Sequence, residues 1–224
     1  RENEPSVLTS TAPATTARGM ALLDATSGEL LAAHNADTRL PMASTTKIMT
    51  ALIVLERCDL EATVTVDQRA VGVEGSSIYL YAGERITVET LLYALLLSSA
   101  NDAAVAVAIA VGGSIENFAA LMNVKCEELG LVDTHFTNPH GLDDDEHYTT
   151  ARELGIIASA ALENEALRKI FSTYKMTVAA PDGGVRLLIN HNRLLRSLCA
   201  TSFNRAMTFI FIICYPLKIT CVII

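Results

Sequence analysis

The sequence predicts an α+β fold, in which helices pack on an antiparallel sheet. Strand-like segments lie on both sides of a central block of helical segments, an order that favours α+β over alternating strands and helices. Half of the 224 residues are hydrophobic, which is enough apolar surface for one sizeable core. We therefore expect one large domain, or one domain with a helical subdomain, and we find no internal repeat.

The first part of the chain is predicted to form strands and then a helix. Two short apolar runs, 18–24 and 29–34, flank a Ser-Gly turn and predict a β-hairpin. Residues 43–57 open with small and hydroxyl side chains and continue as an apolar run, which predicts a helix starting near Ser44. Between 62 and 88, alternating stretches broken by glycines predict short strands and turns.

Helices dominate the next part of the chain, because apolar runs there end at capping residues and glycines. The predicted helices cover 88–97, the stretch from the Ser98–Asp102 turn to Val111, the stretch from Ser114 to Leu129, 151–162 and 165–172. A polar loop over 131–149 lies among them. The alternating runs 174–180 and 185–190 surround a Pro-Asp-Gly-Gly turn and predict a second hairpin.

Composition argues against several classes of function. The net charge is -8 and no run of Lys and Arg occurs, so we expect no nucleic-acid partner. Trp is absent, which leaves little for a base-stacking platform. The five cysteines are odd in number and none has C-x-x-C spacing, which argues against a disulfide framework and a zinc site.

The first candidate for chemistry is Ser44-Thr45-Thr46-Lys47, an S-x-x-K motif at the start of a predicted helix. Residues i and i+3 share a helical face, so the hydroxyl of Ser44 and the amine of Lys47 can meet. A serine becomes a good nucleophile when a base takes its proton, and a lysine acts as that base when its pKa is depressed. A capping Ser followed by a surface Lys is the alternative, but the apolar residues that follow indicate a buried helix.

The second candidate is Ser99-Ala100-Asn101, an S-x-N turn between two apolar helices. A hydroxyl and an amide on a tight turn can point into one cleft, where the hydroxyl relays a proton and the amide holds a substrate carbonyl. An ordinary helix cap is the alternative for this turn taken alone. S-x-x-K followed by S-x-N, about fifty residues later, is typical of penicillin-binding proteins and class A β-lactamases.

Longer stretches resemble the D-alanyl-D-alanine carboxypeptidase family of low-mass penicillin-binding proteins, from residue 18 to about 197. These stretches are PMASTTKIMTALIVLE, LLYALLLSSANDAAVAVA, ELGLVDTHFTNPHGLDDDEHYTTARELGIIA and INHNRLL. The resemblance implies a penicillin-binding-protein fold, with an antiparallel sheet flanked by helices and a helical subdomain. It also implies a serine acyl-enzyme mechanism that removes the terminal D-Ala from peptidoglycan stem peptides.

The same resemblance implies a role for each motif residue. Ser44 would be the acylated nucleophile, Lys47 its base, Ser99 the proton relay to the leaving group, and Asn101 a substrate contact. The implied partners are stem peptides ending in D-Ala-D-Ala, with β-lactam antibiotics as covalent inhibitors. The implied location is extracytoplasmic, in the periplasm or cell wall, after removal of a signal peptide.

A polar loop holds His135, His140 and His147 beside an acidic run. The histidine spacings of five and seven residues do not place ligands on one helical face, and the family carries a similar stretch without a metal role. We therefore expect a structural loop, no metal site and no cofactor.

The family's third motif, K-T-G, does not occur in this sequence. In the family it lies on an edge strand that lines the active site, where it supplies a cation for the substrate carboxylate. The pattern places it near Asn204, about where the resemblance ends. Two other functions therefore stay open, a non-catalytic protein that binds peptidoglycan or penicillin and a β-lactamase-like hydrolase.

The two ends of the chain differ from its middle. Residues 1–17 are rich in Ser, Thr, Ala and Pro and are predicted to be a flexible tether before an incomplete catalytic domain over 18–206. Residues 207–224 form a divergent apolar tail, for which we favour a frameshift or truncation over a membrane-associated segment or a new edge strand. We therefore expect the C-terminal strands of the sheet to be missing.

Overall fold

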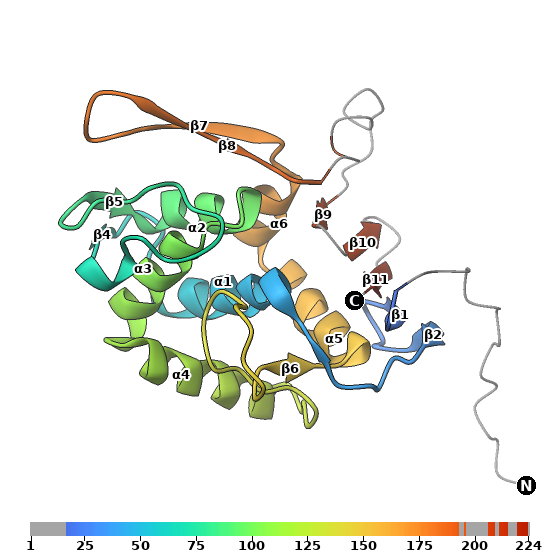
Figure 1. The fold of residues 1–224 in the computed structure, drawn as a ribbon. Helices are drawn as coiled ribbons and strands as arrows, with labels where there is room; N and C mark the ends of the chain where they lie inside the picture. The colour runs from blue at the N-terminus through green and yellow to red at the C-terminus, as the bar shows by residue number, and fades with distance from the viewer. Residues whose placement is uncertain (1–16, 193–194, 196–205, 209–210, 215–218, 224) are drawn as a thin grey trace, which may run out of the picture.

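A computed structural model describes residues 17–192, 195, 206–208, 211–214 and 219–223 (Figure 1). The helices are η1 (Ala43–Thr45), α1 (Thr46–Arg57), η2 (Gln68–Ala70), α2 (Val88–Leu97), α3 (Asn101–Gly112), α4 (Ile115–Glu128), α5 (Ala151–Glu163) and α6 (Glu165–Ser172). The strands are β1 (Met20–Asp24), β2 (Leu30–His34), β3 (Leu40–Pro41), β4 (Thr63–Thr65), β5 (Arg85–Thr87), β6 (Tyr148–Thr149), β7 (Lys175–Ala179), β8 (Val185–Ile189), β9 (Ala206–Thr208), β10 (Phe211–Cys214) and β11 (Ile219–Ile223).

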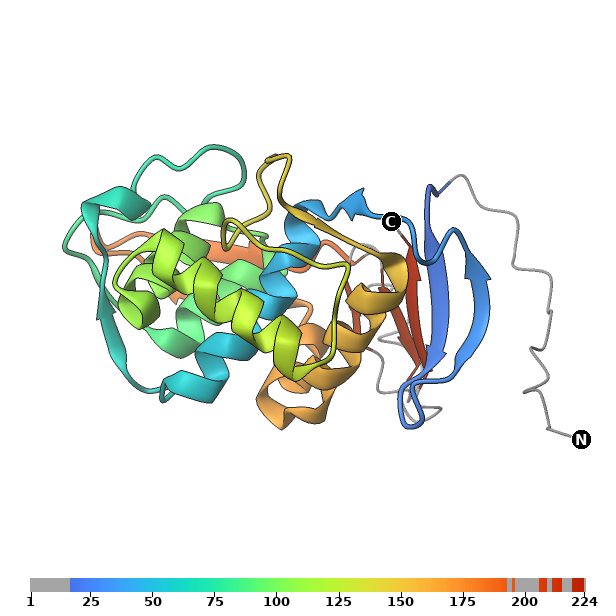
Figure 2. The same cartoon turned by 90° about the horizontal axis from the view of Figure 1, so that it is seen from below.

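The largest sheet joins the two ends of the described chain. Its strand order is β2-β1-β11-β10-β9, and every neighbouring pair is antiparallel. β1 is a central strand, with Met20 opposite Ile223 on one side and opposite His34 on the other. Helix α5 packs against β1 and β11, and Figures 1 and 2 show the described helices on one side of this sheet. The predicted α+β class is confirmed.

Helix α1 is the centre of the helical part and contacts α2, α3, α4 and α5. Its residues from Thr46 to Val54 are all buried, and all of them except Lys47 are apolar or threonine. A helix that is apolar all round belongs in the core of a protein. As a result, Lys47 is carried into the interior, with only 2% of its surface exposed.

The β7–β8 hairpin lies over the α2 end of the helical part (Figure 1). Its residues alternate, so that Arg186 and Leu188 of β8 face inward while Val185, Leu187 and Ile189 are exposed. Period-two alternation is expected for a strand with one buried face. This hairpin and the one formed by β1 and β2 both confirm the sequence prediction.

The C-terminal segment corrects the prediction of missing strands. Residues 206–208, 211–214 and 219–223 form β9, β10 and β11, and β11 pairs with β1 along its whole length. The segment is rich in β-branched and aromatic residues, which suit a pleated strand. The sheet is therefore completed by a segment that lies beyond the stretches used for the family resemblance.

Two further predictions have different outcomes. The alternating stretch 76–81, expected to be a strand, forms no strand in the structure, and its Ile78 and Leu80 N–H groups donate to the carboxylate of Asp102 instead of a neighbouring strand. The predicted tether lies mostly in residues 1–16, outside the described part of the chain, and stays a prediction. Among the described helices none alone is long and apolar enough to cross a membrane, although the bent pair α3 and α4 meets that criterion jointly.

Candidate active site

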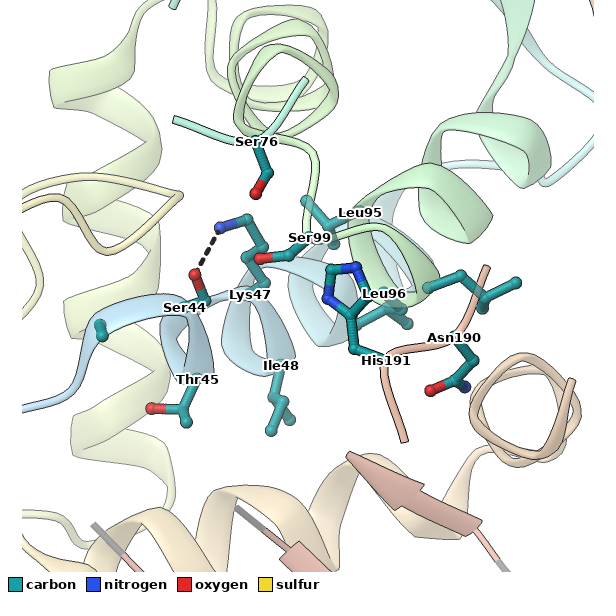
Figure 3. Close-up of a pocket in the computed structure, with 12 residues that line it drawn as sticks. Ser44, Thr45, Lys47, Ile48, Ser76, Leu95, Leu96, Ser99, Asn190 and His191 are labelled. Carbon is teal, nitrogen blue, oxygen red and sulfur yellow. Dashed lines mark hydrogen bonds between the residues drawn. The ribbon is translucent and has the colours of Figure 1, made fainter. Parts of the chain in front are cut away.

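A cavity of about 350 Å³ opens between the start of α1, the α2–α3 turn and the end of β8 (Figure 3). This volume is in the range of small-molecule sites. The lining residues are Ala43, Ser44, Thr45, Lys47, Ile48, Ser76, Leu95, Leu96, Leu97, Ser99, Asn190 and His191. Three of the four residues predicted from the sequence, Ser44, Lys47 and Ser99, are therefore brought together in one cavity.

Ser44 and Lys47 meet as the i, i+3 spacing predicts. Ser44 lies in the 3-10 turn η1 and is exposed to the cavity, whereas Lys47 lies in the buried first turn of α1. The Lys47 Nζ atom is 3.2 Å from Ser44 Oγ, and it donates a hydrogen bond of 2.7 Å to the backbone carbonyl of His140. That carbonyl fixes the amine, so the lone pair of a neutral Lys47 can be directed at the serine hydroxyl.

Burial changes the acid–base chemistry of Lys47. Removal from water disfavours the ammonium form and lowers the pKa of Lys47 to about 7. A lysine with its ordinary pKa would be almost entirely protonated at neutral pH and unable to accept a proton. With the lowered pKa a large fraction of Lys47 is a free amine, so the residue can act as the base for Ser44.

Ser99 is held in a strained conformation at the edge of the cavity. Its φ angle is +54°, in the left-handed region that favours glycine. It follows the C-cap of α2, and the next residue, Ala100, donates its N–H to the carbonyl of Ala94, which closes the helix end. A glycine would fit this backbone better, so what Ser99 adds is its hydroxyl, which Figure 3 shows turned toward Ser44 and Lys47.

Asn101 is not one of the residues that line the cavity. Its side-chain amide donates a hydrogen bond of 2.6 Å to the carbonyl of Glu74, and its backbone N–H donates one of 2.7 Å to the carbonyl of Ser76. Both bonds hold the loop that carries Ser76 against the start of α3. Its role as a substrate contact stays a prediction.

Four polar residues of the cavity, Thr45, Ser76, Asn190 and His191, are not among the predicted site residues, and Thr45 lies within the S-x-x-K motif itself. Ser76 lies on a loop and faces Lys47, while the His191 ring lies beside Ser99 (Figure 3). Asn190 turns its amide away from Ser44 and Lys47 and donates to the carbonyls of Phe171 and Thr173. The sequence INHN is part of the family resemblance, which is a signal for Asn190 and His191. Ser76 is preceded by Gly75 and followed by Ser77, a composition that any surface turn shares, so no signal marks it.

Asp102 anchors the loop that presents Ser76. Its buried carboxylate accepts hydrogen bonds from the Ser77 hydroxyl at 2.6 Å, from the Ile78 N–H at 3.2 Å and from the Leu80 N–H at 3.1 Å. A buried carboxylate needs such donors, because an unpaired charge is costly away from water. The start of α3 therefore fixes the far wall of the cavity.

The histidine-rich loop packs against the first turn of α1, beside Ser44. His140 supplies the carbonyl that binds Lys47, and His147 Nε2 lies 2.7 Å from the hydroxyl of Thr46. Burial lowers the pKa of both imidazoles to about 4, so they are neutral at pH 7. In the described part of the chain, no group of three His, Cys, Asp or Glu side chains is placed to hold a metal ion.

Comparison with known proteins places this cavity in a family. Residues 6–201, which include every residue that lines the cavity, match the family described as D-alanyl-D-alanine carboxypeptidase. The chain belongs to this family of peptidases.

Curated relatives and solved structures agree with this assignment. The D-alanyl-D-alanine carboxypeptidase DacF of Bacillus subtilis is 36% identical over 185 residues, which cover 80% of this chain and 48% of that protein. The D-alanyl-D-alanine carboxypeptidase of Streptomyces sp. (strain K15) is 35% identical over 84% of this chain and 70% of that protein. A mutant of the Streptomyces K15 DD-transpeptidase superposes with a TM-score of 0.82 at 30% identity, over 95% of this chain and 90% of that one. The chain spans about half the length of the Bacillus relative.

An edge strand lies close to the stretch in which the family pattern places the third motif. β9 is an edge strand of the sheet and begins two residues after Asn204, where the family pattern places the lysine of K-T-G. Asn204 itself lies outside the described residues. This carboxypeptidase-family chain therefore has an edge strand close to the expected stretch and lacks the lysine and glycine of the motif.

Proposed function

We propose that this protein is a serine-type D-Ala-D-Ala carboxypeptidase that works through an acyl-enzyme on Ser44. The proposal rests on the position of Ser44 Oγ, which lies 3.2 Å from the buried amine of Lys47 in a cavity that Ser99 also lines. Lys47 takes the hydroxyl proton while Ser44 Oγ attacks the carbonyl carbon of the terminal D-Ala-D-Ala bond. The result is a tetrahedral intermediate bonded to Ser44.

Collapse of the intermediate requires a proton on the departing amine. Ser99 supports this step, because its hydroxyl is turned toward Ser44 and Lys47 and can pass the proton taken by Lys47 to the leaving nitrogen. The C–N bond then breaks and D-Ala leaves with a neutral amine. Water hydrolyses the remaining ester, which releases the shortened peptide and restores Ser44.

The proposed partners and location follow from this chemistry. The substrate is a peptidoglycan stem peptide that ends in D-Ala-D-Ala, and β-lactams acylate the same serine as substrate mimics. Peptidoglycan lies outside the cytoplasmic membrane, so we propose an extracytoplasmic location for the chain.

The missing K-T-G motif favours a second candidate, a protein that binds penicillin without turning over peptide. The cation of that motif serves the substrate carboxylate, and no lysine stands at its place in this sequence. In this second case Ser44 is still acylated by penicillin, because the base and the cavity are present, but release of D-Ala does not follow.

One pair of assays separates these functions. The chain is incubated with a fluorescent penicillin and its intact mass is measured, with Ser44→Ala as the control. We expect one covalent adduct on the parent chain and none on the variant. D-Ala release from a D-Ala-D-Ala peptide supports the carboxypeptidase, and an adduct without release supports the penicillin-binding candidate. Rapid release of hydrolysed penicillin indicates a β-lactamase, and absence of any adduct rejects acylation of Ser44.

A further inference from the structure

We propose that Thr46 and His147 are positioning residues for Ser44, acting through the backbone carbonyl of Ala43. This inference rests on the proposed function for its kinetic effect, but its structural content stands on contacts behind the cavity. Neither side chain lines the cavity, so neither touches substrate.

The starting point is the backbone just before the nucleophile. Ala43 has a φ angle of +46°, which L-residues with a Cβ rarely adopt. Such a conformation persists only where surrounding contacts hold it. Because Ala43 directly precedes Ser44, the direction of its carbonyl fixes the peptide plane from which the nucleophile projects.

Thr46 supplies one of the holding contacts. Its hydroxyl donates a hydrogen bond of 2.8 Å to the Ala43 carbonyl, and the side chain is completely buried. A hydroxyl has one proton, so this bond uses the only donor that Thr46 Oγ1 has. Any further contact of that oxygen must come from a donor.

His147 is that donor, and its tautomer follows from its neighbours. The Thr137 N–H donates to His147 Nδ1 at 3.0 Å, so Nδ1 carries no proton. The imidazole is neutral because burial lowers its pKa to about 4, and its single proton is therefore on Nε2. Nε2 lies 2.7 Å from Thr46 Oγ1 and donates to it. The hydrogen bonds run in one direction, from His147 through Thr46 to Ala43.

The loop that carries His147 also approaches the Ala43 carbonyl directly. Gly141 has a φ angle of +87°, and a Cβ built on it would overlap the Ala43 carbonyl. The neighbouring His140 carbonyl binds Lys47 Nζ at 2.7 Å. One loop, between α4 and β6, therefore sets both the serine turn and the base, and Figure 1 shows it lying against the start of α1.

The test replaces single contacts on the same face of α1. Thr46→Val is isosteric and removes the hydroxyl, while Thr46→Ser keeps it. Thr50→Val is the matched control, because Thr50 is equally buried and its hydroxyl donates 2.7 Å to the Pro139 carbonyl of the same loop without reaching Ala43. His147→Leu removes the imidazole donor, and His147→Gln places an amide N–H near the position of Nε2.

Acylation by a fluorescent penicillin is the kinetic readout. We expect Thr46→Val and His147→Leu to slow acylation by about 10- to 100-fold, since small misplacements of a reacting group cost up to about 10² in rate. Thr46→Ser, His147→Gln and Thr50→Val should stay within about threefold of the parent chain. A purely structural role predicts equal effects of Thr46→Val and Thr50→Val, and that result overturns the proposal.

Crystal structures of the parent, Thr46→Val and Thr50→Val give a readout that does not depend on activity. We expect Ala43 to leave the left-handed region in Thr46→Val alone, with Ser44 Oγ moved out of hydrogen-bond reach of Lys47 Nζ. An unchanged Ala43 and an unchanged Ser44–Lys47 distance in Thr46→Val reject the positioning role even where the proposed function holds. If the parent chain is never acylated, the proposed function fails, and this comparison alone decides the inference.

Discussion

At the scale of single residues, the site depends on a lysine placed where a lysine is costly. Lys47 is almost fully buried, and its hydrogen-bond partners are a carbonyl and a hydroxyl, neither of which carries a charge. Burial without an anion disfavours the ammonium, whereas a buried ion pair would have favoured it. The neutral partners are therefore what makes Lys47 a base at neutral pH.

The rate of acylation should rise with pH through the pKa of Lys47. Because only the free amine accepts a proton, we expect the rate with penicillin to rise about tenfold per pH unit below pH 7 and to level off above it. Stopped-flow measurement of acylation between pH 5 and 9 checks this profile. The pKa of His140 is near 4, so its titration lies below the measured range.

His191 is the second titratable side chain of the cavity and supplies the control. We expect His191→Gln to keep the rise below pH 7, because the base is Lys47. A flat profile in that variant would show that the imidazole governs the rate and would contradict the role of Lys47.

The strain at Ser99 predicts a conflict between stability and activity. A left-handed residue with a Cβ costs about 1–2 kcal/mol, and glycine avoids that cost. We therefore expect Ser99→Gly to be more stable than Ser99→Ala by about 1 kcal/mol in urea unfolding. Both variants should lose about 10² or more in turnover, because both lack the hydroxyl to which we assign the proton relay. Equal stability of the two variants would remove the argument that strain is retained for the sake of the hydroxyl.

The sequence predicted the residues whose placement depends on local geometry. Ser44 and Lys47 are three positions apart on one helix, so their meeting needs no knowledge of the rest of the fold. Ser76 and His191 reach the same cavity from positions far along the chain, and their approach depends on tertiary contacts. For Ser76 no local pattern carries that information, and for His191 the signal is the INHN stretch of the family resemblance.

At the scale of elements, the loop before β5 is held by one ion pair to β8. Arg186 lies 2.5 Å from Glu84, and the two side chains are only 10% and 3% exposed. Arg186 also donates a hydrogen bond of 2.9 Å to the Tyr79 carbonyl. The pair therefore joins the β7–β8 hairpin to the loop that carries Ser76.

Breaking this pair should be much more costly than breaking an exposed one. Arg186→Met leaves the Glu84 carboxylate buried without its partner, and we expect a loss of about 3–5 kcal/mol in urea unfolding. Arg152→Met is the matched control, because Arg152 pairs with Asp37 at side-chain exposures of 38% and 65% and should cost at most about 1 kcal/mol. The double variant Arg186→Met/Glu84→Leu should recover part of the loss. Similar losses in the two single variants would show that the Glu84 pair contributes no more than a surface contact.

Element prediction succeeded where capping and periodicity agreed. The helix over 88–97 was predicted with the bounds that the structure has, since Thr87 caps its start and the Ser98 turn ends it. The stretch 76–81 has the alternation of a strand, yet Asp102, more than twenty residues away, accepts two of its N–H groups, those of Ile78 and Leu80. A side chain from a distant helix can replace a strand partner, and alternation alone does not reveal it.

At the scale of the whole molecule, the sheet is closed by pairing of the two ends of the described chain. β1 lies between β2, its hairpin neighbour, and β11, which follows about 200 residues later. Hairpin pairing is local and was predicted, whereas the pairing with β11 is not local. The sequence predicts a divergent tail for the apolar C-terminal stretch, because the absence of the K-T-G motif is evident from the sequence. The strand with which this stretch pairs, β1, is evident only from the structure.

The strand order predicts that proline is tolerated at one position of this segment and not at another. Cys221 lies in β11, between β1 and β10, where Leu22 and Ile212 are its Cα partners. Met207 lies in the edge strand β9 and pairs with Ile212 alone. Proline removes a ladder donor and is confined to sheet edges.

We therefore expect Cys221→Pro to cost about 3 kcal/mol or more and to aggregate, since it opens β1 as an unpaired edge. Met207→Pro should cost clearly less, because β9 has a neighbour on one side only. Urea unfolding and size-exclusion chromatography of both variants check this order. If both substitutions leave stability and solubility unchanged, the C-terminal segment is no part of the sheet, and α5 must bury its face without β11. If both are equally damaging, β9 is not the edge of the sheet, and the strand order β2-β1-β11-β10-β9 is wrong at that end.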